Sequence, residues 1–199
     1  PDQATRARAQ VRKWADPAER IAVARRMYAW RLGEILPDDE ITVLRGIEGA
    51  RMKALYKRLA DQFGIQWRGR RYDRAAPEAA DYANQAINHA STAVLAIAQL
   101  AVTISGAIPQ LGFIHEDSGF AFALDIADLF RGSITVPIAF AAVNEQSTPA
   151  NAHRDVPIER IVRRLAGQRF RKEKLVSQMI DRIKELFDAN DRRRDERAS

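Results

Sequence analysis

The sequence predicts an all-α protein built as a bundle of several helices, and three observations favour this fold class. Apolar residues recur at steps of three and four over long stretches. Proline and glycine fall between these stretches, and no segment shows the apolar–polar alternation of a half-buried β-strand. With 199 residues, of which 46% are hydrophobic, the chain suits a domain with a buried core. Cysteine is absent, which excludes disulfides and thiolate zinc sites and fits a reducing compartment.

Residues that start or stop helices bound the predicted elements in order along the chain. Asp16 and Pro17 form an N-cap and first-turn pair that opens the first amphipathic helix. Pro37 opens the second helix, which continues to Gly64, a residue type that often follows a helix C-terminus. Further helices are predicted over about 78–107, about 120–131, a short stretch from Pro137, about 156–166 and about 170–188.

These elements are expected to form one helical domain over residues 1–188. The charged residues 189–199 are expected to be a frayed tail. The start, PDQATRARAQ, has neither a methionine nor the apolar core of a signal peptide, and it is typical of a chain that is entered midway.

One long segment raises the question of a membrane span. Residues 82–114 carry no formal charge, and this length is sufficient to cross a bilayer. The segment also contains Asn, Gln, His, Ser and Thr side chains, whose transfer into lipid is costly. We therefore predict a buried core helix, no membrane association and a cytoplasmic protein.

The charged residues are unevenly distributed. The net charge is +6, yet residues 75–153 contain seven acidic residues against the single base Arg131, and basic segments flank them on both sides. A basic surface around an acidic pocket suits metal-dependent chemistry on nucleic acid, because lysine and arginine hold phosphates while carboxylates hold a cation. An ordinary basic helical protein with solvated faces is the alternative.

The segment GFIHEDSGFAFALDIADLFR, residues 112–131, combines acids with large apolar residues. Asp125 and Asp128 fall on one face of the predicted helix, and that helix is otherwise apolar all round, which indicates burial. Buried carboxylates require a positive partner. Arg131 is the nearest base in the sequence and offsets only one of them. We therefore expect a divalent cation, and His115 stands close enough in sequence to contribute to its site.

Glu48 interrupts the apolar stripe of the second predicted helix. It lies four residues after Leu44 and four before Met52, so its side chain is expected to face the core. A half-exposed glutamate that pairs with Arg45 or Arg51 on its own helix is the alternative.

One histidine and three acids are thus candidates for a single buried site, namely Glu48, His115, Asp125 and Asp128. Carboxylate oxygens with one imidazole suit Mg²⁺ or Mn²⁺. His89 and His153 do not precede a helix with unexplained aspartates, and they are interpreted as ordinary hydrogen-bonded residues.

Two stretches, RGIEGARMKALYKRLADQFGIQWRGRRYD and NQAINHASTAVLAIAQLAVTISGAIPQLGFIHEDSGFAFALDIADLFR, together resemble a known family. The glutamate of RGIEG, the histidine of GFIH and the aspartates of DIAD follow in the order found in the CRISPR-associated integrase, the first Cas protein, and most closely in its type I-E form. The resemblance covers about residues 15–170. It implies an all-helical C-terminal catalytic domain, and the small β-rich N-terminal domain of the family is absent from this chain.

The resemblance also implies roles for individual residues. Glu48, His115 and Asp128 correspond to the family's ligands for Mg²⁺ or Mn²⁺, and Asp125 corresponds to an additional catalytic acid. Arg131 stands where a lysine is expected after DIAD. Our candidates for holding DNA are Arg45, Arg70, Arg71 and Arg131 on phosphates and Tyr72 and Trp67 on splayed bases, although Trp67 alternatively packs onto its own domain.

The implied function is a metal-dependent DNA endonuclease and integrase, a hydrolase of the EC 3.1 class, that inserts spacers into CRISPR arrays in antiviral defence. It joins a DNA 3′-hydroxyl to a phosphodiester of the repeat, and related cleavage uses water. The implied partners are spacer-precursor DNA, the CRISPR repeat, a second copy of the chain and the small second Cas protein. Two alternatives stay open, namely an inactive helical DNA-binding or assembly module and an unrelated metal-dependent phosphohydrolase. The absence of an adjacent His-Asp pair counts against the second alternative.

Overall fold

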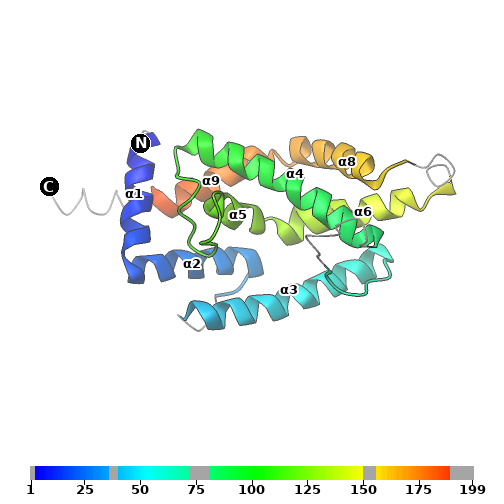
Figure 1. Ribbon diagram of the computed structural model, residues 1–199, viewed down its shortest axis with the longest axis horizontal. Helices are drawn as coiled ribbons and strands as arrows, with labels where there is room; N and C mark the ends of the chain where they lie inside the picture. The colour runs from blue at the N-terminus through cyan, green and yellow to red at the C-terminus, as the bar shows by residue number, and fades with distance from the viewer. Residues whose placement is uncertain (1–2, 36–39, 72–80, 150–155, 189–199) are drawn as a thin grey trace. The chain divides into compact units, whose positions relative to one another are not determined.

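The computed structural model describes residues 3–35, 40–71, 81–149 and 156–188, and every regular element within these ranges is helical (Figure 1). The prediction of an all-α protein is therefore confirmed. The elements are α1 (Gln3–Ala15), α2 (Pro17–Leu32), α3 (Ile41–Phe63), α4 (Tyr82–Ser105), α5 (Ala121–Asp128), the π-helix η2 (Arg131–Thr135), α6 (Val136–Gln146), α8 (Ile158–Lys172) and α9 (Leu175–Phe187).

The chain divides into two compact units, each built from stretches that are far apart in the sequence. The first unit draws on residues 1–46, 95–129 and 174–199, and the second on residues 47–94 and 130–173. Two of the four boundaries fall inside α3 and α4, and the other two fall between α5 and η2 and between α8 and α9. Each unit has its own aromatic cluster.

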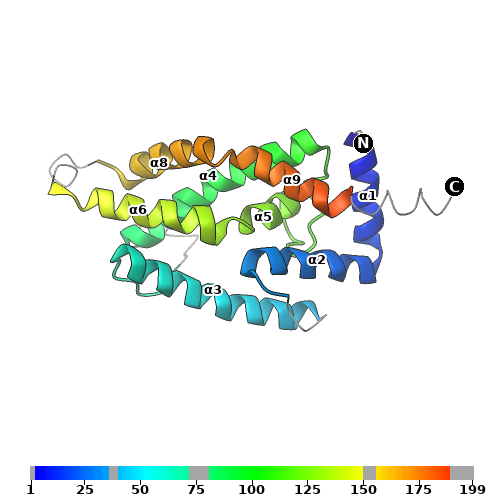
Figure 2. The same ribbon diagram turned by 180° about the vertical axis from the view of Figure 1, so that it is seen from behind.

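The core of the first unit brings the two ends of the chain together. The C-terminal end of α9 meets α1 (Figures 1 and 2), and the Arg6 guanidinium contacts the Asp188 carboxylate at 3.1 Å. Phe113, Phe122 and Phe187 form an aromatic cluster with ring centroids 5.6–6.1 Å apart. All three rings are almost completely buried, so α9 covers the loop that precedes α5.

The turn between α1 and α2 forms as the sequence predicts. The Asp16 carboxylate accepts hydrogen bonds from the backbone N–H groups of Ala18 and Glu19 at 2.8 and 3.2 Å, and Pro17 occupies the first turn of α2. Helix α1 itself was not predicted, because its many charged residues leave only a narrow apolar stripe.

The second unit packs α6 against α8, which lie side by side in Figures 1 and 2. Trp67 stacks on Tyr56 with ring centroids 5.3 Å apart. It also packs against Phe140 in a T-shaped arrangement, with ring centroids 5.7 Å apart. Gly132 permits a further close approach, because a Cβ at this position would lie 2.7 Å from Cδ2 of Leu55.

Helix α4 is, among the described residues, the one straight helix long and apolar enough to cross a membrane. Only 33% of the most apolar 18-residue stretch of α4 is buried. Ala86, Ile87, Ala90 and Val94 on one face are buried, whereas Leu100 is 47% exposed. The prediction of a core helix is therefore correct for one face of α4, and the other face is open.

Two boundaries differ from the sequence prediction. The helix expected over 120–131 ends at Asp128, and a π-helix follows it before α6 begins at Val136. The break between α8 and α9 lies at Lys174, whose φ of 50° is in the left-handed region. No glycine or proline at this point predicts the break. Pro37, Tyr72, His153 and the predicted tail at 189–199 lie outside the described residues.

Candidate active site and basic groove

Asp125 organises the loop that carries His115. Its carboxylate accepts three backbone hydrogen bonds, from Phe113 at 2.6 Å, Ile114 at 3.1 Å and His115 at 2.9 Å. The carboxylate side chain is 0% exposed. Three N–H groups that converge on one carboxylate stabilise its negative charge, so a buried Asp125 does not require a metal ion.

Gly112 allows the loop to close on the start of α5. A Cβ at this position would collide with the carbonyl oxygen of His115 and would lie 2.8 Å from Cβ of Ala121. The indole N–H of Trp14, at the end of α1, donates to the Gly112 carbonyl at 3.0 Å. Hydrogen bonds therefore fix the loop at two points, from the Trp14 indole to the Gly112 carbonyl and from the loop's own backbone N–H groups to Asp125.

His115 lies between the two aspartates. Its Nδ1 is 2.7 Å from Oδ1 of Asp125, and its Nε2 is 3.9 Å from Oδ2 of Asp128. The hydrogen bond to Asp125 raises the pKa of His115 above its ordinary value, burial opposes this shift, and the negative charges of both aspartates add to it. When Asp125 is ionised it accepts the proton on Nδ1, which leaves Nε2 directed toward Asp128.

Asp128 has a positive partner that the sequence did not reveal. Nη1 of Arg31 lies 3.1 Å from Oδ2 of Asp128, and the two side chains are 9% and 15% exposed. Arg131, the base nearest in the sequence, donates instead to the Tyr56 hydroxyl at 3.2 Å in the second unit. Arg31 and the backbone N–H groups therefore compensate negative charge that the sequence analysis left without a partner, and the divalent cation stays a prediction.

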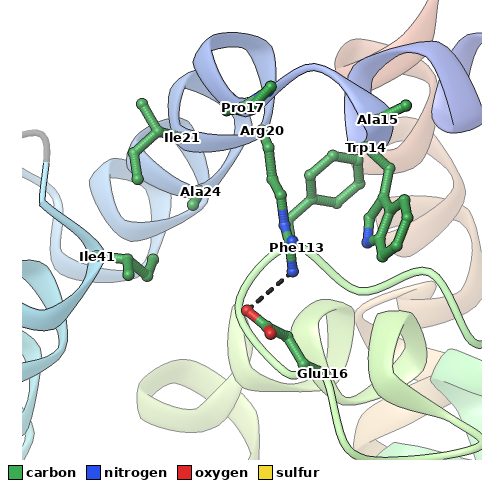
Figure 3. A pocket seen from close by; sticks show the side chains of 9 residues that line it. All are labelled: Trp14, Ala15, Pro17, Arg20, Ile21, Ala24, Ile41, Phe113 and Glu116. Carbon is green, nitrogen blue, oxygen red and sulfur yellow. Dashed lines mark ion pairs between the residues drawn. The ribbon is translucent and has the colours of Figure 1, made fainter.

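A pocket of about 380 Å³ lies beside the His115 loop, and Figure 3 shows its lining. Arg20 spans it, with its guanidinium 5.0 Å from the Trp14 ring centroid and 2.8 Å from the Glu116 carboxylate. The Arg45 guanidinium donates to the Ile114 carbonyl at 2.5 Å. Arg45, predicted to hold DNA, thus also supports the loop.

The structure brings three of the four predicted catalytic residues together in the first unit, namely His115, Asp125 and Asp128. Glu48 lies in the second unit and is half-buried on α3, with buried Leu44 and Met52 one turn away on either side. Within the parts of the chain that the structure describes, no group of three or more His, Asp or Glu side chains has the geometry of a metal site. The role of Glu48 as a ligand stays a prediction.

The donor atoms of His115 and Asp128 nevertheless fit two ligands of a hard divalent cation. One imidazole nitrogen and one carboxylate oxygen face each other, and these are donor types that Mg²⁺ and Mn²⁺ accept. The bond from Asp125 to Nδ1 is typical of histidines that ligate metals, since it fixes the ring and leaves Nε2 available.

A basic groove of about 920 Å³ lies on the second unit, between α3 and residues 67–70. Lys53, Lys57 and Arg68 line it and are exposed, and Asp61 is the acidic residue of its lining. Lys53 and Lys57 are one helical turn apart, so their ammonium groups point to the same side. Trp67 forms part of the wall and stacks on Tyr56, as the packing alternative anticipated.

The predicted phosphate-binding arginines of this region differ in their surroundings. Arg70 donates to the side-chain oxygens of Asn84 at 2.9 Å and Asn88 at 2.6 Å, which fixes its guanidinium on α4. The side chain of Arg71 is exposed, and its backbone N–H donates to Asn84 at 2.9 Å. Sequence reasoning missed Lys53, Lys57 and Arg68, although the spacing of the two lysines on one helix face was an available signal.

Comparisons with known proteins give one consistent result. The family model for CRISPR associated protein Cas1 matches residues 32–157. The chain is 35% identical over 179 residues to CRISPR-associated endonuclease Cas1 2 of Thermus thermophilus, covering 89% of this chain and 53% of that protein. It is 34% identical over 184 residues to CRISPR-associated endonuclease Cas1 of Escherichia coli, covering 92% and 57%.

Solved structures agree with these relatives. The crystal structure of a TtCas1–DNA complex superposes with a TM-score of 0.81 at 34% sequence identity, covering 92% of this chain and 66% of that chain. The crystal structure of TtCas1 superposes with a TM-score of 0.77 at 33% identity. The chain spans little more than half the length of the curated relatives it matches.

Proposed function

The chain belongs to the Cas1 family of CRISPR-associated proteins, and we propose that it is a divalent-metal-dependent DNA endonuclease and integrase of spacer acquisition. Its relatives are named endonucleases, which supports nuclease chemistry. The observation that carries the proposal is the placement of His115 between two aspartates. Asp125 holds Nδ1, and Nε2 is directed toward Asp128.

Three side chains would hold the cation in this proposal, namely Glu48, His115 and Asp128. A bound Mg²⁺ or Mn²⁺ acts as a Lewis acid on a phosphodiester oxygen. The role of Asp125 is to keep the proton of His115 on Nδ1, so that Nε2 presents its lone pair. In the proposed reaction a DNA 3′-hydroxyl displaces the leaving oxygen at phosphorus, and water in its place gives cleavage.

The proposed DNA-binding surface includes the basic groove of the second unit. Lys53, Lys57 and Arg68 present exposed positive charge there, and Arg70 has its guanidinium fixed by two asparagines. Exposed cations that exchange salt counterions for phosphates supply affinity without sequence preference. The stacked Trp67 adds an aromatic surface suited to unpaired bases.

The wider setting of the proposal comes from the family. The crystal structure of a TtCas1–DNA complex is that of a relative bound to DNA, which supports DNA as a partner of this chain. Within the proposal, that DNA is the spacer precursor and the CRISPR repeat. A second copy of the chain, the small second Cas protein and a cytoplasmic location complete the proposal.

The decisive experiment measures Mn²⁺-dependent nicking and strand transfer on branched DNA. Asp128→Asn should abolish both reactions, whereas Asp117→Asn, on the exposed part of the His115 loop, should leave them unchanged. Equal activity in the parent and in Asp128→Asn would refute the proposed site. A parent protein that binds DNA but neither nicks nor joins it would favour the assembly module.

A separate measurement tests the groove. The combined change Lys53→Ala, Lys57→Ala and Arg68→Ala should weaken DNA binding and reduce the slope of log K against log salt by about two to three, because each lost phosphate contact releases about one counterion fewer. Arg163→Ala, which removes an exposed arginine of α8, is the matched control. An unchanged slope in the triple variant would place the phosphate contacts outside the groove.

A further inference from the structure

The ion pair of Arg31 with Asp128 is not accounted for by the metal-binding role proposed for Asp128. Arg31 lies in the last turn of α2, where the helix dipole favours a cation, and α2 ends at Gly33 with φ 74°. Its guanidinium reaches Asp128, 97 positions further along the chain. Both side chains are mostly buried, so this pair is not a solvated surface contact.

The pair engages one particular oxygen. Oδ2 of Asp128 is the atom 3.1 Å from Arg31 Nη1, and it is also the atom 3.9 Å from His115 Nε2. A cation shared by His115 and Asp128 would therefore meet the oxygen that the guanidinium already contacts. Two positive charges at one carboxylate oxygen repel each other, so each weakens the binding of the other.

We propose that Arg31 is a placeholder cation, which occupies the His115-facing oxygen of Asp128 in the metal-free protein and competes with the divalent ion for it. Arg31 is a positioning residue in this scheme, since it acts through Asp128. It keeps the carboxylate oriented and its charge balanced in the empty site, and in doing so it lowers the affinity for metal. This inference rests on the proposed function in one respect, because it takes Asp128 as a metal ligand.

The test uses Mn²⁺ alone as the probe, with binding measured by isothermal titration calorimetry and melting followed by circular dichroism. Arg31→Met removes the charge and retains much of the side-chain length. Arg26→Met is the matched control, because Arg26 lies on the same helix, is exposed and donates to the Glu185 carbonyl.

Arg31→Met should lower the melting temperature in the absence of metal and tighten Mn²⁺ binding at least tenfold. Arg26→Met should leave the Kd for Mn²⁺ unchanged. Arg31→Gln, which is uncharged but able to donate to Asp128, should tighten binding in the same direction and serves if Arg31→Met does not fold.

Two further outcomes separate this inference from the proposed function. If the parent binds Mn²⁺, Asp128→Asn abolishes binding and neither Arg31 variant tightens it, the placeholder role is overturned while the metal site stands. Parent protein that shows no Mn²⁺ binding would overturn the metal site and the placeholder role together.

Discussion

Replacing Asp125 by asparagine removes one oxygen acceptor from a site that uses both. Oδ2 accepts from the backbone N–H groups of Phe113 and Ile114, and Oδ1 accepts from the backbone N–H of His115 and contacts its ring Nδ1. An amide oriented with its NH₂ at the Oδ2 position would strand two backbone donors. With its NH₂ at the Oδ1 position it strands only the His115 backbone donor, and it donates to Nδ1, so this orientation should prevail.

The cost follows from these contacts. One buried N–H without an acceptor costs about 1–3 kcal/mol, and the two bonds that remain lose the charge of their acceptor, which adds about 1 kcal/mol. Asp125→Asn should therefore destabilise the protein by about 2–4 kcal/mol, equivalent to a fall in Tm of about 5–15 °C for a chain of this size.

The same substitution should move the proton of His115. Because the asparagine NH₂ donates to Nδ1, neutral His115 must carry its proton on Nε2, where it can no longer ligate a cation. Calorimetric melting measures the first effect, and ¹⁵N NMR of the imidazole measures the tautomer. Asp117→Asn on the same loop is the control. A Tm within 2 °C of the parent, or a proton still on Nδ1 of neutral His115, would refute the role assigned to Asp125.

Three further predictions concern packing and protonation. Phe187→Ala should cost about 3–5 kcal/mol in chemical denaturation because the ring is 1% exposed, and Phe120→Ala, where the ring is 51% exposed, should cost far less. The raised pKa of His115 means that its contribution to stability is complete below pH 6.5 and is lost as pH rises through the folded-state pKa; an NMR titration that finds a pKa at or below 6.5 would contradict this. Gly132→Ala should cost less than about 1 kcal/mol, because the added Cβ meets only Cδ2 at the flexible end of the Leu55 side chain, and a double-mutant cycle with Leu55→Ala measures that contact.

Local signals in the sequence predicted the parts of the fold that depend on neighbouring residues. Asp16 and Pro17 start α2 because the capping carboxylate and the fixed φ of proline act within a few residues. Asp125 and Asp128 share α5 because helical spacing is a local property. The burial of Leu44 and Met52 likewise follows from periodicity.

The partners of the acids could not be predicted in this way. Arg31 meets Asp128 across 97 positions, and no pattern distinguishes it from the other arginines of α2. The backbone N–H groups that hold Asp125 carry no side-chain signature at all, so the negative charge seemed uncompensated. The break between α8 and α9 lies at Lys174, where no glycine or proline marks the end of a helix, so the residue types do not predict it. Each of these features depends on tertiary structure.

The aromatic cluster of the first unit has a consequence for biosynthesis. Phe187 covers Phe113 and Phe122, and Arg6 meets Asp188 across 182 positions, so the first unit combines segments that are synthesised far apart in time. At about 5–20 residues per second, roughly 3–12 s separate the synthesis of Asp125 from that of Phe187. Throughout that interval the nascent chain holds two large aromatic rings without their cover, so the loop that carries His115 acquires its native packing only after α9 has been synthesised.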